Sequence, residues 1–357
     1  MALDSIRLVN FRSYRDETFE LEKGVNIIVG PNASGKTNLL EAIGIICIGK
    51  SHRLKERELI RFSQTWARID ATKDSAARSF KLELLPNEKS RKTFIINNQT
   101  STRLPLPKTS PAVLFEPNHM QLLIGKPGLR RDFLDDLIEQ TSLDFGKIRS
   151  KYNRVLTQRN TLLKKGPISA KEQIFPWDIR LSELAGRIVK ERSHIISKFN
   201  QQINQLYKKL SRAKTNIELV YETTIPVTNF ESRYLIALQK NLELDATRGF
   251  TTIGPHRDDL GVLVDGHPAM EVASRGEIRT LLLALKIMEV KLVEVSRGQK
   301  PILLLDDVFS ELDGARRRAL TKFLKNYQTF ITTTDADVVV QHFMDDCHII
   351  PLTKNQM

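Results

Sequence analysis

The feature that most constrains the fold of this 357-residue chain is an octapeptide, GPNASGKT, at positions 30–37. It satisfies the pattern G-x-x-x-x-G-K-[ST], in which the backbone turns tightly and points successive N–H groups at a phosphate. The preceding run VNIIV, residues 25–29, is typical of a buried strand, and the apolar residues after Asn38 indicate a helix. A glycine-rich surface turn would not account for both flanks. We therefore predict a phosphate-binding loop at a helix N-terminus.

The residue types in this loop suggest a division of roles. The glycines at both ends supply backbone freedom, Lys36 can neutralise the β and γ phosphates, and the Thr37 hydroxyl can ligate a bridging Mg²⁺. We predict a catalytic role for Lys36. The predicted nucleotide site comprises Gly30, Pro31, Asn32, Ala33, Ser34, Gly35, Lys36 and Thr37.

A second chemical element, PILLLDD, occupies residues 301–307. An apolar run that ends in two acids is typical of a buried strand delivering carboxylates to a metal site. By the division of labour in P-loop enzymes, Asp306 would hold Mg²⁺ directly or through water, and Asp307 would orient and deprotonate the attacking water. The run alone is unremarkable, and it becomes specific because a phosphate loop precedes it in the same chain.

Between these elements lies Ser274-Arg275-Gly276-Glu277, followed by the pattern LLLALKIMEVKLVEV. A serine and a glycine at the head of a long helix form an anion site, because a hydroxyl, bare N–H groups and the helix dipole converge there. Serine is also a common helix cap, so the pattern taken alone favours a simple capped helix.

Positive charge is concentrated in one part of the chain. Lys and Arg number 55 against 42 Asp and Glu, giving a formal net charge of +13. Residues 146–214 hold 17 Lys and Arg against 4 Asp and Glu, whereas the remainder of the chain is balanced. Such a field indicates a polyanionic partner, because these side chains neutralise phosphates and release counterions. A solvated helix face is the alternative.

Other features argue against several protein classes. No run approaches the roughly 20 apolar residues of a membrane span, and the start MALDSIRLVNF carries charge where a signal peptide is apolar. Cys47 and Cys347 lie far apart without metal-binding spacing and are expected in the core. We expect a cytoplasmic protein without a membrane partner, a disulfide framework or a zinc site.

Apolar periodicity predicts an α/β body with a helical insertion. The head is expected to comprise residues 1–125 and 245–357, and the helical arm residues 126–244, with the strongest basic character in 146–214. Within the arm, Gly166-Pro167 should break the helices, and Asp178 is a candidate cap of the next one. Further expected elements are strands at 5–11, 18–21, 80–85, 92–97, 112–115 and 216–222, and a helix at 231–244.

The phosphate loop, the Ser-x-Gly-Glu helix head and the hydrophobic-DD strand, in this order, resemble the ATP-binding-cassette (ABC) class of ATPases. The long basic segment between them is similar to the DNA-repair branch of that class, beside the structural-maintenance-of-chromosomes (SMC) proteins. Within this branch the chain resembles the RecF family. The matching stretches span almost the whole chain: LVNFRSY, GPNASGKTNLLEAI, Ser51-His-Arg53, Phe115-x-Pro117, Gly125-x-Pro-x-x-Arg-Arg131, GPHRDD at 254–259 and LLLDDVFSELD.

The resemblance implies an ABC-type head with an antiparallel β subdomain and an all-helical, hairpin-like or coiled-coil-like insertion. It implies weak, DNA-stimulated ATP hydrolysis with Mg²⁺, and phosphate contacts from Arg12. It further implies an ATP-dependent homodimer in which Ser274, Arg275 and Gly276 close on the nucleotide of the other subunit. The family's role implies binding to double-stranded DNA next to single-strand gaps, and helping the RecO and RecR proteins to load the RecA recombinase. Such binding should be largely independent of sequence, because no base-reading motif is visible.

Three places depart from the pattern. Arg275, Glu277 and Ile278 stand where Gln-rich residues are usual, Asn118-His119 replaces an acidic pair, and Asp335 takes the place of a switch histidine.

Rival interpretations are an OLD-type nuclease or another SMC-like ATPase of DNA metabolism, a transporter ATPase subunit and a small-molecule kinase. The stretch after Asp313 is short for a nuclease domain, the long spacing argues against a transporter, and a kinase has no use for the signature serine.

Overall fold

The computed structural model describes residues 2–51, 53–86, 89–116, 119–165, 173–211, 215–343 and 347–353. His52, Pro117, Asn118, Gly166 and Pro167, named above, lie outside these residues. The chain forms two compact units. The head unit comprises Met1–His119 and Glu289–Met357, and the arm unit comprises Met120–Met288.

The arm unit extends past residue 244, where the sequence placed the end of the arm. The reason is a strand pairing, because β9 (Ile217–Glu222) pairs antiparallel with β10 (Asp259–Val264). This pairing keeps the segment after residue 244 with the arm helices. The arm also begins at residue 120 rather than 126.

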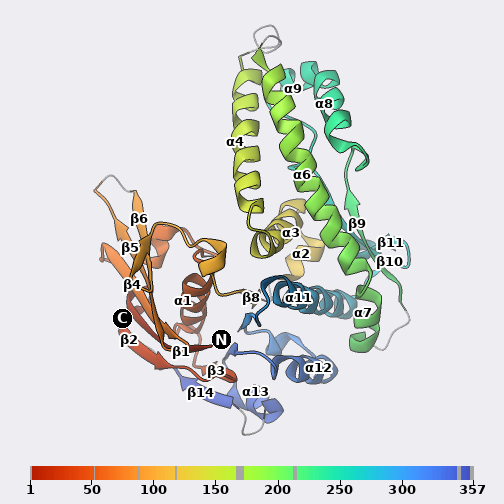
Figure 1. Ribbon diagram of the computed structural model, residues 1–357. Coiled ribbons are helices and arrows are strands. Elements are labelled where there is room, and N and C mark those ends of the chain that lie inside the picture. The colour runs from red at the N-terminus through yellow and green to blue at the C-terminus, as the bar shows by residue number, and fades with distance from the viewer. Residues whose placement is uncertain are drawn as a thin grey trace. The chain divides into compact units, whose positions relative to one another are not determined.

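A five-stranded parallel sheet in the head unit positions the phosphate loop (Figure 1). Its order is β14-β3-β13-β12-β8, and each neighbouring pair is parallel. The strand before the phosphate loop and the strand ending in Asp306 therefore both flank β13, and their carboxyl ends meet at one edge of the sheet. The strands are β3 (Val25–Val29), β8 (Ala112–Phe115), β12 (Ile302–Asp306), β13 (Thr329–Thr333) and β14 (Cys347–Pro351).

The predicted antiparallel subdomain is a six-stranded sheet in the order β2-β1-β4-β5-β6-β7. Helix α1 (Lys36–Ile48) contributes Leu39, Ile43 and Ile46 to a core cluster that also holds side chains from both sheets. The helix is buried on most faces, as its sequence predicted, and ends at Gly49, whose φ of 86° suits glycine. The strands are β1 (Leu3–Phe11), β2 (Tyr14–Glu20), β4 (Trp66–Lys73), β5 (Ala76–Leu84), β6 (Ser90–Ile96) and β7 (Gln99–Ser101).

Shorter elements complete the head unit. Helices α12 and α13 follow β12 and β13 in the chain, and the described loops of this unit contain short 3-10 turns. Their bounds are α12 (Gly314–Leu324), α13 (Ala336–Phe343), η1 (Glu56–Leu59), η2 (Leu106–Lys108) and η4 (Phe309–Glu311).

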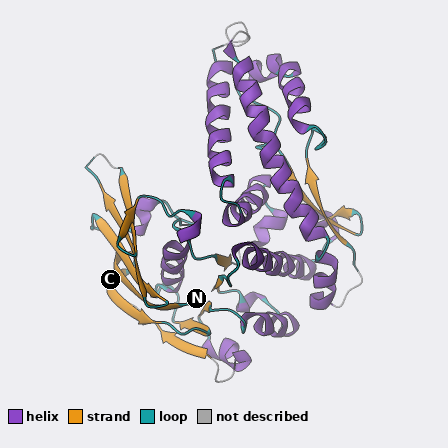
Figure 2. Cartoon of the chain, viewed as in Figure 1, coloured by secondary structure: helices purple, strands orange, loops and turns teal. Residues whose placement is uncertain are grey.

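Helices dominate the described part of the arm unit, and its strands β9, β10 and β11 form a small sheet (Figure 2). Helices α4, α6 and α8 lie side by side (Figure 1). The predicted single helix at 231–244 is two helices, broken at Asn241, which has non-helical dihedral angles. The elements are α2 (Met120–Ile124), α3 (Pro127–Thr141), α4 (Phe145–Leu163), α6 (Phe175–Asn200), α7 (Ile203–Ser211), α8 (Phe230–Lys240), α9 (Leu242–Arg248), β11 (His267–Pro268), α10 (Ala269–Val272) and α11 (Arg275–Arg297), whose last residues belong to the head unit.

Two arginines of the basic window lie in the arm core rather than on its surface. The Arg159 guanidinium donates to Asp178 at 2.6 Å and to Asp245 at 2.7 Å, and Arg192 donates to both oxygens of Asp135. The predicted capping role of Asp178 is therefore wrong, because α6 begins at Phe175 and Asp178 serves as a buried counterion. A buried guanidinium requires such partners, since an unpaired charge in the core is very costly.

The other basic residues of the arm are largely exposed. The outer face of α4 carries Lys147, Lys151 and Arg154, which follow one another at intervals of four and three residues. Lys165, about three turns after Arg154, continues this face just past the end of the helix. Further exposed cations among the described residues are Lys164, Arg180, Arg187, Lys190, Lys198, Lys208 and Lys209.

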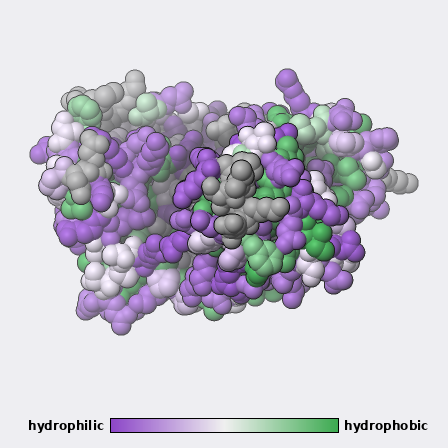
Figure 3. Space-filling model, turned by 90° about the horizontal axis from the view of Figure 1, so that it is seen from above, coloured by the Kyte–Doolittle hydropathy of each residue, from purple (hydrophilic) through white to green (hydrophobic). Residues whose placement is uncertain are grey.

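Among the residues that the structure describes, no helix is long and apolar enough to cross a bilayer. The face drawn in Figure 3 is mostly hydrophilic, and its hydrophobic residues form small separate patches.

The GPHRDD stretch (residues 254–259) ties the arm's sheet to its helices through buried polar contacts. Arg192 donates to the Pro255 carbonyl at 2.7 Å, and Arg130 forms a paired contact with Asp259. His256 lies 2.7 Å from the Tyr152 hydroxyl through Nδ1 and 3.1 Å from the Thr251 carbonyl through Nε2. Because a carbonyl only accepts, Nε2 carries the proton and Nδ1 accepts from Tyr152, which satisfies the neutral ring.

Burial lowers the pKa of His256 from 6.5 to about 4. His256 is therefore protonated in the unfolded chain at pH values at which it stays neutral in the folded chain. The folded protein loses stability as the pH falls from about 6.5 towards 4. Between pH 7.5 and pH 5, protonation of His256 in the unfolded chain should lower the free energy of unfolding by about 2 kcal/mol.

The His256→Gln variant keeps an amide donor but does not titrate at this position. Its free energy of unfolding should therefore fall by about 2 kcal/mol less than that of the wild type over this interval. Urea unfolding of both proteins at the two pH values measures the difference, in which the titration of other groups cancels. Equal losses in the two proteins would contradict the buried neutral histidine.

Candidate nucleotide site

The phosphate loop lies between β3 and α1, as the sequence predicted. The Gly30 N–H donates to the Thr333 carbonyl, and the Tyr14 hydroxyl donates to the Gly35 carbonyl at 3.0 Å. Gly35 has a φ of 98°, and a Cβ there would lie 2.9 Å from the Tyr14 hydroxyl. A Cβ on Gly30 would lie 2.6 Å from the Ser34 Oγ and the Leu352 carbonyl. Both glycines are therefore required by the close approach of the surrounding chain.

The Lys36 ammonium folds over the loop. It donates to the carbonyls of Gly30 at 2.7 Å and Pro31 at 2.8 Å. Partial burial lowers its pKa, and the charges of Asp307 and Asp306 oppose this shift. The loop thus already holds a cation at its mouth, and the two carbonyls that bind it are exchangeable for phosphate oxygens.

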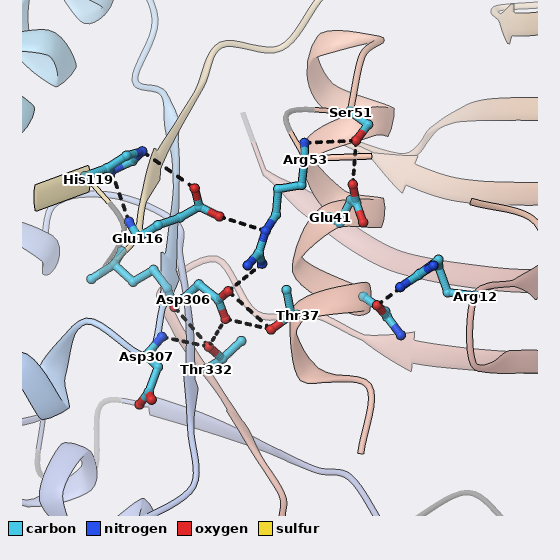
Figure 4. A network of polar contacts seen from close by, with 12 residues as sticks. Arg12, Thr37, Glu41, Ser51, Arg53, Glu116, His119, Asp306, Asp307 and Thr332 are labelled. Atoms are coloured by element: carbon cyan, nitrogen blue, oxygen red, sulfur yellow. Dashed lines mark hydrogen bonds and ion pairs between the residues drawn. The ribbon is translucent and has the colours of Figure 1, made fainter. Parts of the chain in front are cut away.

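Asp306 meets Thr37 although the two residues lie far apart in sequence. The Thr37 hydroxyl is 2.9 Å and 3.2 Å from the two carboxylate oxygens, and the Thr332 hydroxyl donates to Oδ1 at 2.8 Å (Figure 4). This is the arrangement expected if a hydroxyl and a carboxylate share one Mg²⁺. The two predicted metal-binding residues are therefore adjacent in the fold.

Asp307 has an unusual backbone and a different orientation. Its φ is 51°, which is uncommon for a residue other than glycine, and its N–H donates to the Thr332 hydroxyl at 2.9 Å. The Ser310 hydroxyl donates to the Asp307 carbonyl at 2.7 Å. In Figure 4 its carboxylate points away from the contact between Thr37 and Asp306. Such backbone geometry is concentrated at functional sites, where it aims a side chain.

Arg53, which no sequence motif assigned to the site, contacts Asp306. Arg53 Nη1 is 2.9 Å from Asp306 Oδ2, and its Nε is 3.2 Å from Glu116 Oε1. His119 contacts the same segment, because its Nδ1 accepts the Glu116 N–H at 3.1 Å. The matching stretches around Ser51-His-Arg53 and Phe115-x-Pro117 were the only signal in the sequence for these residues.

Arg12 lies beside the start of α1. Its guanidinium donates to the Glu58 carbonyl at 2.8 Å and lies 3.5 Å from the Asn38 side-chain oxygen. Asn38 in turn donates to the Ser13 hydroxyl at 3.0 Å. Arg12 is therefore near the helix that begins at the phosphate loop, and its contact with phosphates remains a prediction.

Ser274, Arg275 and Gly276 belong to the arm unit, whereas the phosphate loop and Asp306 belong to the head unit. The Ser274 N–H donates to the Glu277 carboxylate at 2.8 Å, and the Glu277 N–H donates to the Ser274 hydroxyl at 3.3 Å. This reciprocal pair is a capping box, so the capped helix considered above exists. Ser274 and Arg275 are exposed.

The head-unit residues fit a nucleotide with Mg²⁺. Ser34 Oγ is buried in the loop and has no hydrogen-bond partner among the described atoms. The glycine cradle leaves room where a Cβ would collide. The described residues contain no cluster of three His, Cys, Asp or Glu ligands. A metal at Thr37 and Asp306 would thus have two protein oxygens and take the rest from phosphates and water, which is the usual behaviour of Mg²⁺.

Known proteins are similar to this chain over most of its length. A family model of the RecF/RecN/SMC N-terminal domain matches residues 2–356. The DNA replication and repair protein RecF of Heliobacterium modesticaldum is 38% identical, with 94% of this chain and 92% of that protein covered. The protein of the same name from Streptococcus uberis is 35% identical, with 94% of each chain covered.

Solved structures show the same fold. The recombination mediator protein RecF-ATPrS of the RecFOR pathway gives a TM-score of 0.86 at 29% identity, covering 99% of this chain and 98% of that chain. The corresponding RecF-ATP structure gives 0.84 at 31% identity, with 93% and 92% covered. An Smc head domain from Pyrococcus furiosus, 16% identical over 99% of this chain and 94% of that chain, gives 0.54 and supports the fold alone.

The family match and the relatives together cover almost the whole chain, including the phosphate loop, the strand that ends in Asp306 and the arm. They confirm the fold predicted from the sequence, an ABC-type α/β head with an antiparallel subdomain and a helical insertion. The chain belongs to the RecF family of the RecF/RecN/SMC N-terminal domain proteins.

Proposed function

We propose that this chain is an ATPase of DNA repair and replication that binds ATP with Mg²⁺ and uses hydrolysis as a switch. The contact between Thr37 and Asp306 carries the proposal, because it brings the phosphate loop and an acidic strand end together in a metal-binding arrangement. The similar structure with ATP in its name supports the same cofactor.

The residues suggest a mechanism. The Lys36 ammonium would exchange the Gly30 and Pro31 carbonyls for the β and γ phosphates. Thr37 and Asp306 would hold Mg²⁺, which supplies charge neutralisation of the developing transition state. Asp307 would orient a water in line with the γ-phosphate and take its proton, so that the water oxygen bonds to the γ-phosphorus while the bond to the bridging oxygen breaks and ADP leaves. Arg12 would contribute a further positive charge to the phosphates.

We further propose that ATP joins two copies of the chain. The capping box holds Ser274 at the head of the 23-residue helix α11, whose dipole favours an anion at this end. Ser274, Arg275 and Gly276 of one subunit would close on the γ-phosphate held by Lys36 of the other. Each nucleotide would then be shared between subunits, and hydrolysis would release the dimer.

Two substitutions should block different steps of this cycle, one of them ATP hydrolysis and the other ATP-dependent dimerisation. Asp307→Asn removes the proposed base but keeps the size of the side chain, so hydrolysis should slow about 10²- to 10⁴-fold while an ATP-bound dimer accumulates. Ser274→Arg places bulk at an exposed helix head, so each subunit should bind ATP but remain monomeric. Light scattering with ATP and Mg²⁺ measures the two masses.

Lys36→Met is the matched control, because it should neither bind a fluorescent ATP analogue nor dimerise while keeping its fold. A monomeric Asp307→Asn protein, or an ATP-dependent dimer of Ser274→Arg, would show that the nucleotide is not shared. A single-subunit ATPase or a small-molecule kinase would then be the better interpretation.

For the helical arm we propose sequence-independent binding to duplex DNA next to single-strand gaps. Its exposed lysines and arginines on α4 and α6 support this, because phosphate contacts carry no base information. ATP hydrolysis would be weak and stimulated by DNA, in the cytoplasm. RecO and RecR would be the partners through which RecA is loaded, in keeping with the RecFOR pathway named for the similar structures.

Reversing two charges on the outer face of α4, Lys151→Glu with Arg154→Glu, should weaken binding to all duplex sequences alike. The slope of log affinity against log salt should fall by about 2, one unit for each lost phosphate contact. Arg15→Glu with Lys23→Glu reverses two exposed charges in the head unit and is the matched control. If the α4 variant binds like the control, DNA contacts another surface. Fluorescence anisotropy over a salt series provides both quantities.

A further inference from the structure

Arg53 joins two carboxylates that come from separate strand ends. Its guanidinium contacts Asp306, at the end of β12, through Nη1 at 2.9 Å, and Glu116, just after β8, through Nε at 3.2 Å. The other oxygen of Asp306 already accepts from Thr37 and Thr332. Among the described residues, Arg53 is the cationic side chain that forms an ion pair with Asp306.

The burial of the three side chains differs. The Asp306 and Glu116 side chains are 11% and 13% exposed, whereas the Arg53 side chain is 37% exposed. A carboxylate as buried as Asp306 requires a cation or several donors, because its solvation is largely lost. Because the Arg53 side chain is exposed, packing alone does not hold it against Asp306.

The backbone next to Arg53 is fixed to α1. The Ser51 hydroxyl donates to Glu41 at 2.5 Å and accepts the N–H groups of Arg53 and Leu54 at 3.2 Å and 2.9 Å (Figure 4). A cavity lined by Thr37, Glu41, Arg53, Glu116 and Asp306 adjoins the guanidinium. Because the neighbouring backbone is held by these hydrogen bonds, movement of Arg53 is confined to its side chain.

We propose that Arg53 is a positioning residue. It pairs with the Asp306 carboxylate until Mg²⁺ binds to that carboxylate, and afterwards it pairs with Glu116 alone. The inference builds on the proposed binding of ATP with Mg²⁺. Before the metal binds, Arg53 keeps Asp306 from repelling the incoming phosphates. When the metal binds, it competes with Arg53 for Asp306, and Glu116 lowers the cost of release by retaining the guanidinium.

The test measures binding of a fluorescent ATP analogue, first with EDTA and then over a Mg²⁺ titration. Arg53→Gln should weaken metal-free binding about fivefold, because Asp306 is left uncompensated, and should lower the Mg²⁺ concentration at half-saturation about fivefold. Glu116→Gln should raise that Mg²⁺ concentration instead. In the double variant the effect of Glu116→Gln should vanish, since no guanidinium remains to be held.

Two further variants are controls. Arg61→Gln removes the same charge from the following loop, where no described contact reaches Asp306 or Glu116, and should leave both measurements unchanged. Arg53→Lys keeps the charge and should stay close to the wild type. Thermal unfolding of the metal-free proteins checks that each variant is folded.

Other outcomes would overturn the inference. Equal weakening by Arg53→Gln with and without Mg²⁺ would make Arg53 a direct phosphate ligand. Unchanged Mg²⁺ titrations in both Arg53→Gln and Glu116→Gln would make the cluster purely structural. A wild type that fails to bind the analogue at any Mg²⁺ concentration would overturn the proposed function itself, which separates the two failures.

Discussion

The contact between the Thr37 hydroxyl and the Asp306 carboxylate depends on nearly every other feature of the head unit. It requires β3 and β12 to lie on either side of β13 with their carboxyl ends at one edge. It also requires α1 to begin at Lys36, which the tight glycine loop enforces. The buried faces of α1 then hold the two sheets together, so that the core fixes the distance between two oxygen atoms.

The sequence predicted the features that local residues determine. The phosphate loop, its strand and its helix have a motif and a periodicity of their own, and the pairing of Thr37 with Asp306 followed from the chemistry of such loops. The cluster of Arg53, Glu116 and Asp306 could not be derived in this way, because its members lie on three segments whose proximity only the sheet order determines.

The arm shows a second limit of sequence reasoning. Counting charges treats every lysine and arginine as exposed, yet Arg159 and Arg192 are buried with carboxylate partners from distant segments. Asp178 has the residue type and position of a helix cap, and burial next to Arg159 gives it another role. At Ser274 the two interpretations were never exclusive, because a capped helix keeps its dipole.

The place of β3 in its sheet has a consequence for how the protein is made. Both neighbours of β3 come from the last part of the chain, since β13 spans Thr329–Thr333 and β14 spans Cys347–Pro351. During synthesis the phosphate loop is therefore made before either strand that pairs with β3, and it has no parallel sheet to support it until β13 and β14 have emerged. A chain that stops before Thr329 lacks both neighbours of β3, so this sheet cannot hold the phosphate loop in place.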